Sequence, residues 1–171
     1  MMKIATAAMA ATLAMLAAGP AAALNDAQIA HIAYTADSVD IAWAQLALQK
    51  TTNPKVRQFA RDMVRDQSAL NILALALFQK LNLTPAPSGT SASLDRSADA
   101  KRRQYASLIG PAFDRTYVQN EIAYHRTVNS ALRSHLIPDA KSPELKLLLQ
   151  AGLQKFEEHQ TEGELLATQL S

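Results

Sequence analysis

The 171-residue chain contains no cysteine. Disulfide frameworks, thiolate nucleophiles, iron–sulfur clusters and cysteine-ligated zinc are therefore excluded. The chain also lacks an excess of charge of one sign, because 17 Lys and Arg residues face 15 Asp and Glu residues and only 19% of residues are charged. Neither a protein that coats nucleic acid nor an acidic disordered tail fits this composition. Any metal or acid–base chemistry must come from histidine and carboxylate side chains.

The first 23 residues have the pattern of a secretory signal peptide. Lys3 precedes an apolar run over residues 4–18, and Gly19 and Pro20 lead into three alanines that end at Ala23. The run is shorter than the roughly 20 residues needed to cross a bilayer, and there is neither a cysteine to carry a lipid nor a twin-arginine pair. We expect cleavage after Ala23 and a mature protein in the periplasm or outside the cell, without a stable membrane anchor.

The mature chain, 24–171, has the pattern of a single all-α domain. Apolar residues recur every three or four positions over 25–50, 54–82, 112–136 and 143–170, and no segment alternates with the period of a strand. Asn53 before Pro54 and Ser142 before Pro143 are typical helix starts. The loop 83–91 predicts a long crossover, and a short extra helix over 98–109 precedes the third long helix. These elements predict a four-helix bundle.

Polar residues occupy positions where the apolar stripe of each long helix would place a core residue. They are Asp40 in the first helix, Asp66 and Gln67 in the second, Glu121 and His125 in the third, and His159 in the fourth. With a rise of about 1.5 Å per residue, Asp40 and Asp66 differ by about 3 Å in height along the bundle. Glu121 and His159 share one height, and His125 lies about 6 Å from it. The spacing therefore predicts one polar layer in the middle of the bundle.

Two interpretations of this layer are open. Burying polar groups is costly unless they pair, hydrogen-bond or bind a cation, and inward-facing carboxylates and imidazoles are how helical bundles build metal sites. The layer is then a site for one divalent transition metal held by Asp40, Asp66, Glu121, His125 and His159, with Gln67 supporting a ligand. Alternatively, the layer is a structural hydrogen-bond network in a non-catalytic envelope or stress-related module that binds a protein partner or a second copy.

Four segments resemble domain-of-unknown-function family 4142, a family of exported, ferritin-like bacterial proteins. They are VDIAWAQLA over 39–47, FARDMVRDQ over 59–67, FDRTYVQNEIAYH over 113–125 and LQKFEEH over 153–159. The resemblance covers nearly all of the mature chain, and the Phe-Asp-x-x-Tyr followed by His in the third helix is its most specific part. It implies a ferritin-like four-helix bundle with a candidate metal site, and it implies no known reaction.

Carried over residue by residue, the resemblance assigns the family's polar positions to Asp40, to Asp66 with Gln67, to His125 and to His159. Two positions depart from the family pattern, because Asp40 replaces a longer Glu and Gln67 replaces a His, which is the better metal ligand. The two Glu-x-x-His pairs of diiron bundles are absent. Ferroxidase or oxygenase activity is therefore disfavoured, and the sequence contains neither a nucleophile elbow nor a Gly-rich phosphate loop.

Several remaining polar residues have structural interpretations. His31 and His135 fall near helix ends and are not expected to be ligands. Asp114 is expected to cap the first turn of the third helix, and Tyr117 and Tyr124 are expected in the core.

Overall fold

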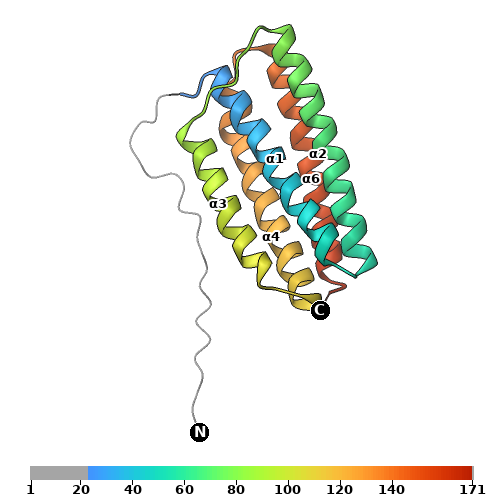
Figure 1. Ribbon diagram of the computed structural model, residues 1–171. Coiled ribbons are helices and arrows are strands. Elements are labelled where there is room, and N and C mark those ends of the chain that lie inside the picture. The colour runs from blue at the N-terminus through green and yellow to red at the C-terminus, as the bar shows by residue number, and fades with distance from the viewer. Residues whose placement is uncertain (1–22, 171) are drawn as a thin grey trace.

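The structure, a computed structural model, describes residues 23–170 (Figure 1). The predicted signal peptide lies outside the described residues except for its last residue, Ala23. The helices are α1 (Asp26–Lys50), α2 (Pro54–Lys80), α3 (Gly89–Ala106), α4 (Gly110–Ala131), α5 (Ile137–Asp139) and α6 (Pro143–Ala167), with a π-helical turn over Leu132–Leu136. Residues 23–170 contain no strand and no helix that is long and apolar enough to cross a membrane.

Three of the long helices begin at the predicted caps. The Asn25 side chain accepts a hydrogen bond from the backbone N–H of Gln28, whose side chain bonds back to the Asn25 backbone N–H. Asn53 caps α2 immediately before Pro54, and Ser142 caps α6 immediately before Pro143. These side chains satisfy backbone N–H groups that have no partner within the helix.

Two antiparallel helix pairs form the bundle. In Figure 1, α1 runs down and α2 returns beside it, while α4 runs up and α6 returns beside it. An ion pair of 3.8 Å between Lys80 and Glu144 joins the end of α2 to the beginning of α6, so these neighbours are also antiparallel. The predicted four-helix bundle with a crossover after its second helix is confirmed.

The crossover differs from the prediction in one respect. Its extra helix, α3, has 18 residues and begins at Gly89, nine residues earlier than expected, and it ends at Ala106. The reason is a capping box in which Ser88 accepts a hydrogen bond from the Ser91 backbone N–H and the Ser91 side chain accepts one from Ser88. The predicted loop over 83–91 is therefore a loop only as far as Ser88.

The second half of α2 is rotated relative to the predicted apolar stripe. Leu73, expected in the core, is 56% exposed, whereas Asn71, Ala74 and Phe78 are buried. Gln67 takes the inward position after Met63, and the spacing of the buried residues that follow it continues from Gln67 rather than from Leu70. The buried face of α2 is therefore the face that carries Gln67.

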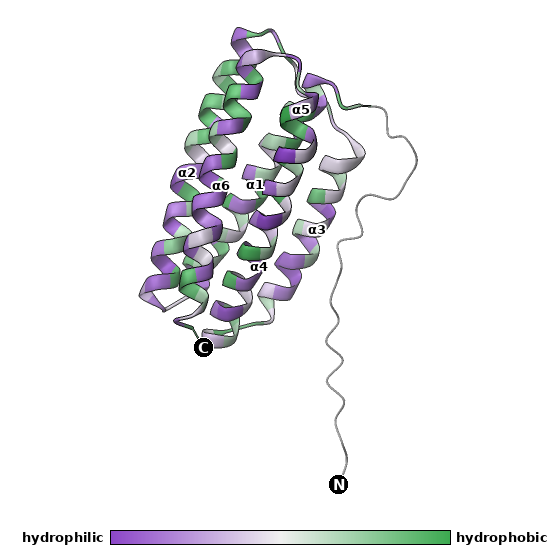
Figure 2. Ribbon diagram, turned by 180° about the vertical axis from the view of Figure 1, so that it is seen from behind, coloured by the Kyte–Doolittle hydropathy of each residue, from purple (hydrophilic) through white to green (hydrophobic). Residues whose placement is uncertain are grey.

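Two apolar clusters lie in the bundle on either side of the polar layer. One contains Trp43, Phe59 and Tyr117, and the other contains Ile29, Leu145 and Phe156. Figure 2 shows polar and apolar residues on the same turns of each helix, as expected of helices with one buried face. The polar layer therefore lies between two regions of apolar packing, with little access to water.

Candidate metal centre

The structure brings the predicted polar residues from α1, α2, α4 and α6 to one level in the bundle. Asp40, Gln67, Glu121 and His125 are completely buried and His159 is 3% exposed. Asp66 differs, because its side chain retains 15% exposure at the rim of the layer. One ligand atom from each of Asp40, His125 and His159 lies within 4.8 Å of the other two. Only these three of the predicted ligands form a compact cluster.

His125 presents one nitrogen to Asp40 and the other to its own helix. Its Nδ1 lies 2.8 Å from the backbone oxygen of Glu121. Because a carbonyl oxygen can only accept, this hydrogen bond assigns the proton to Nδ1 and the lone pair to Nε2. Nε2 lies 3.5 Å from Asp40 Oδ2 and has no hydrogen-bond partner. Burial lowers the pKa of His125, although Asp40 and the hydrogen bond to Glu121 act against it, so the imidazole is neutral at neutral pH.

His159 is held in the same manner by a different acceptor. Its Nε2 lies 3.0 Å from Asp66 Oδ2, and its buried Nδ1 has no hydrogen-bond partner. Burial alone would raise the pKa of Asp66, but hydrogen bonds from Arg65 and His159 outweigh burial and lower that pKa to about 2. Asp66 is therefore ionised and accepts a hydrogen bond from the N–H at His159 Nε2. It orients the His159 ring instead of joining the cluster, which differs from its predicted role as a ligand.

Gln67 fixes the carboxylate of Asp40. Its Nε2 donates a hydrogen bond of 2.8 Å to Asp40 Oδ2, while Asp40 Oδ1 and Gln67 Oε1 have no hydrogen-bond partner. The amide thus supports the carboxylate from α2, as the sequence predicts, and leaves one carboxylate oxygen free within the layer.

Glu121 lies beside the cluster rather than in it. Its Oε2 is 3.8 Å from His125 Nδ1, the nitrogen that faces away from Asp40. Burial, followed by the charge of Asp40 and a side-chain hydrogen bond with Asp40, raises the pKa of Glu121 well above its ordinary value and favours its protonated form. Burial followed by the Glu121 charge also raises the pKa values of the buried hydroxyls of Tyr105 and Tyr117.

One buried acid near the cluster was not predicted. Asp37 is buried one helical turn before Asp40, and burial followed by the charge of Asp40 raises its pKa. The sequence signal was the spacing of three residues between these two carboxylates on one helix face. Asp37 therefore adds a second buried carboxyl with a raised pKa beside the layer.

The remaining singled-out residues lie elsewhere. His31 Nδ1 is 3.4 Å from the Thr35 hydroxyl, and His135 is exposed. Tyr117 and Tyr124 are in or against the core, as predicted, and the Tyr124 hydroxyl donates a hydrogen bond to the Ala36 backbone oxygen. The predicted capping role of Asp114 is wrong: α4 has no side-chain cap, and Asp114 is buried with an unpartnered Oδ1. The helix begins at Gly110, so Asp114 lies past its first turn.

The cluster combines the imidazoles of His125 and His159 with the carboxyl group of Asp40, and the second nitrogen of each imidazole already has a hydrogen-bond partner. Histidines that bind metals characteristically donate their other N–H to a carboxylate or a backbone carbonyl, which fixes the tautomer and the ring orientation. The donor set of two nitrogens and one oxygen suits a divalent transition cation. The residues present therefore have the chemistry and the arrangement needed to ligate one such ion.

Two solved structures share this fold. A DUF305 protein from Streptomyces coelicolor is 14% identical with a TM-score of 0.71, over 84% of this chain and 91% of that one. CopM in its Cu(II)-bound form is 17% identical with a TM-score of 0.65, over 88% of this chain and all of that one. No protein of the curated set is significantly similar in sequence. The family described as Domain of unknown function (DUF4142) matches residues 10–166, and the chain belongs to this family.

Proposed function

We propose that this protein binds one divalent transition-metal cation, preferentially Cu(II), through Asp40, His125 and His159. The observation that carries the proposal is the pair of buried nitrogens, His125 Nε2 and His159 Nδ1, that have no hydrogen-bond partner. A buried polar group without a partner costs about 1–3 kcal/mol. A cation placed among the three side chains would satisfy both nitrogens and a carboxylate oxygen at once.

The preference for Cu(II) has two supports. Sites built from nitrogen and oxygen donors bind Cu(II) more tightly than the other divalent ions of the first transition row. CopM, which has the same fold, was solved with Cu(II) bound. A cation in the cluster would also favour the ionised form of the neighbouring Glu121, and we therefore expect loading to release protons.

The proposed role is binding of the metal outside the cytoplasm, without a reaction of its own. The signal-peptide pattern over residues 1–23 supports export. The DUF305 protein carries a provisional designation as a secreted protein. The absence of paired Glu-x-x-His motifs from the sequence argues against a dinuclear oxidase.

Equilibrium dialysis against CuSO4 tests the proposal. Protein stripped with EDTA should take up one equivalent of Cu(II), and His125→Leu and His159→Leu should each lose most of that uptake. His135→Leu, which removes an exposed histidine, is the matched control and should bind as the parent does. Uptake below about a tenth of an equivalent by folded parent protein, or equal uptake by all variants, would overturn the proposal.

A structural polar layer in an interaction module is the second candidate. Direct hydrogen bonds from Gln67 to Asp40 and between His159 and Asp66 favour it, because they partly close the network without a cation. Exposed Ile72, Leu73 and Leu75 on α2 would offer a partner an apolar face. Under this alternative, copper should stabilise the parent and the His125→Leu variant equally.

A further inference from the structure

A large cavity lies within the bundle, between α3 and the helices that it covers. Its volume is about 1290 Å³, and its walls come from α1, α2, α3, α4 and α6 together with the π-helical turn. Protein interiors are normally packed so closely that few voids exceed a water molecule, and small-molecule sites usually measure about 300–1000 Å³. A cavity of this size is therefore more than a packing defect.

The cavity follows from the way α3 is attached. This helix packs chiefly on α1 and touches α4 only slightly. The C-terminal half of α3 is fixed by the buried side chain of Tyr105, by a hydrogen bond from Lys50 to the Ala106 carbonyl, and by one from Trp43 to the Ala98 carbonyl. Leu94, in the N-terminal half, lines the cavity. Figure 1 shows α3 on the outside of the bundle, alongside α1 and α4.

The walls of the cavity are mainly apolar and extend along the bundle. Ile32, Leu94, Val128, Leu149 and Phe156 line it from four helices. Along α4 and the π-helical turn, the lining residues extend from 120 to 136, which corresponds to about 24 Å of helical rise. An apolar slot of this length has the shape of an extended acyl chain.

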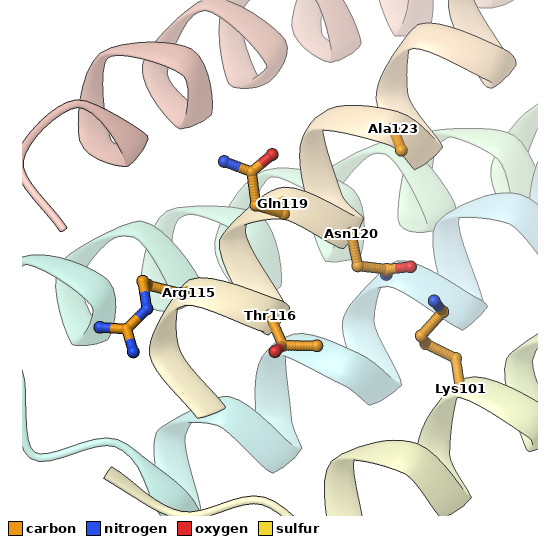
Figure 3. A pocket seen from close by; sticks show the side chains of 6 residues that line it. All are labelled: Lys101, Arg115, Thr116, Gln119, Asn120 and Ala123. Carbon is orange, nitrogen blue, oxygen red and sulfur yellow. The ribbon is translucent and has the colours of Figure 1, made fainter. Parts of the chain in front are cut away.

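A polar hollow of about 380 Å³ adjoins the cavity and shares three of its lining residues, Lys101, Asn120 and Ala123. In Figure 3, Lys101 reaches from α3 towards Asn120 of α4, and Arg115, Thr116 and Gln119 project from the same stretch of α4. No acidic side chain lines the hollow. Within residues 23–170, neither Lys101 nor Arg115 forms an ion pair, so two cationic side chains line this hollow, and Lys101 lies where the hollow meets the cavity.

The acids that line the large cavity do not oppose these charges. Asp37 lines the cavity from α1, and burial followed by the charge of Asp40 raises its pKa, which favours its uncharged form. Asp139 lies in α5, beyond the π-helical turn and at the opposite end of α4 from Arg115. The slot is therefore lined mainly by apolar residues, with polar side chains such as Thr90, Thr127 and Ser130 among them, and two cations line the hollow at one end.

We propose that this slot binds a single-chain anionic amphiphile, with the apolar chain in the cavity and the anionic head group beside Lys101 and Arg115. The inference is independent of the metal centre, because the proposed metal ligands Asp40, His125 and His159 do not line the cavity that would hold the apolar chain of the amphiphile. A carboxylate or a phosphate head group has the same chemistry towards these two cations.

Displacement of a fluorescent fatty acid, 11-(dansylamino)undecanoate, tests this binding. We expect saturable binding of one molecule per chain, with displacement by dodecanoate or dodecyl phosphate below their micelle concentrations. The stronger competitor identifies a fatty acid or a phosphate-bearing lipid as the natural class. Dodecyltrimethylammonium, with the same tail and a positive head, should compete at least about tenfold more weakly. Equal competition by the cation, or no saturable binding of the probe, would overturn the proposal.

A variant that fills the slot provides a second test. Gly152 lines the cavity, and a Cβ atom there meets nothing within 4 Å. Gly152→Phe should therefore fold and lose at least about tenfold in affinity for the probe, since its ring takes the place of the chain. Ala151→Phe, at an exposed neighbouring position of the same helix, is the control and should bind normally. Unchanged binding by folded Gly152→Phe would place the amphiphile elsewhere.

The head-group assignment has its own pair of variants. Lys101→Gln should weaken dodecanoate binding about fivefold, as expected for a partly exposed ion pair, and should leave binding of a neutral analogue, dodecanol, unchanged. Arg103→Gln removes the same charge from an exposed position of α3 that does not line either hollow. Equal effects of the two substitutions would show that Lys101 acts only through the net charge of the protein, which would contradict the assigned head-group position.

Discussion

Replacing His125 by leucine should stabilise the metal-free protein and destabilise the metal-loaded one. The imidazole is completely buried, and its Nε2 lacks a hydrogen-bond partner 3.5 Å from Asp40. Removing such a group recovers about 1–3 kcal/mol, while losing the hydrogen bond to the Glu121 carbonyl costs about 1 kcal/mol. Leucine is also apolar and of comparable size, and Phe156 packs against this ring. In EDTA, we therefore expect His125→Leu to be about 0–2 kcal/mol more stable than the parent.

Copper should reverse this order. A ligand at a hundred times its dissociation constant stabilises the folded state by about 2.7 kcal/mol. The parent should gain this amount, whereas the variant, which lacks one of three ligands, should gain almost none. The variant should then be about 1–3 kcal/mol less stable than the loaded parent.

Urea unfolding followed by far-ultraviolet circular dichroism, in EDTA and in excess Cu(II), measures both differences. His135→Leu is the control for general effects of copper on exposed histidines. A loss of several kcal/mol by His125→Leu in EDTA would refute the reasoning, because the imidazole would then be a necessary part of a closed network. An equal response of variant and parent to copper would refute it as well.

Two further predictions concern packing and pH. Gly152→Ala should stabilise the protein by about 0.8–1 kcal/mol, because it removes a glycine from a helix interior and its Cβ meets no neighbouring atom. At Gly163 the new Cβ of Gly163→Ala would lie 3.1 Å from Ile122 and 3.2 Å from the Phe59 ring, so this variant should be about 1–3 kcal/mol less stable than Gly152→Ala. Equal unfolding midpoints of the two variants in urea would contradict this prediction. Asp37 is protonated in the folded state because burial raises its pKa, so its contribution to stability is present at low pH and is lost as the pH rises above about 4. Asp37→Asn should therefore lose less free energy of unfolding between about pH 4 and about pH 7 than the parent, and an identical loss in both proteins would show that the carboxyl ionises freely.

Helix starts and the level of the polar layer could be predicted because both depend on local geometry. Helix starts are recognisable at Asn25, Asn53 and Ser142, because the side chain of each accepts a hydrogen bond from a backbone N–H in the first turn. The rise per residue is constant, so distances along each helix follow from counting. By contrast, α3 buries only Ser91 and Tyr105, so its sequence has too few regularly spaced apolar residues to predict the full length of the helix.

The division of roles within the layer depends on the rotation of each helix about its axis. Asp66 and Gln67 are adjacent in sequence and differ by about 100° around α2. Packing of the whole bundle decides that Gln67 points inward to Asp40 while Asp66 stays at the rim with His159. The same rotation places Leu73 on the surface. Periodicity could not separate these choices, because Leu70, Leu73 and Leu77 have the same spacing as the buried residues 71, 74 and 78.

Electron paramagnetic resonance of the protein loaded with one equivalent of Cu(II) tests the central claim most directly. The account predicts a single copper species with hyperfine coupling to two imidazole nitrogens. This species should be largely lost in His125→Leu and in His159→Leu, while His135→Leu should retain it with both couplings. A spectrum that is the same in the parent and in all three variants would place the copper outside the buried cluster and contradict the account.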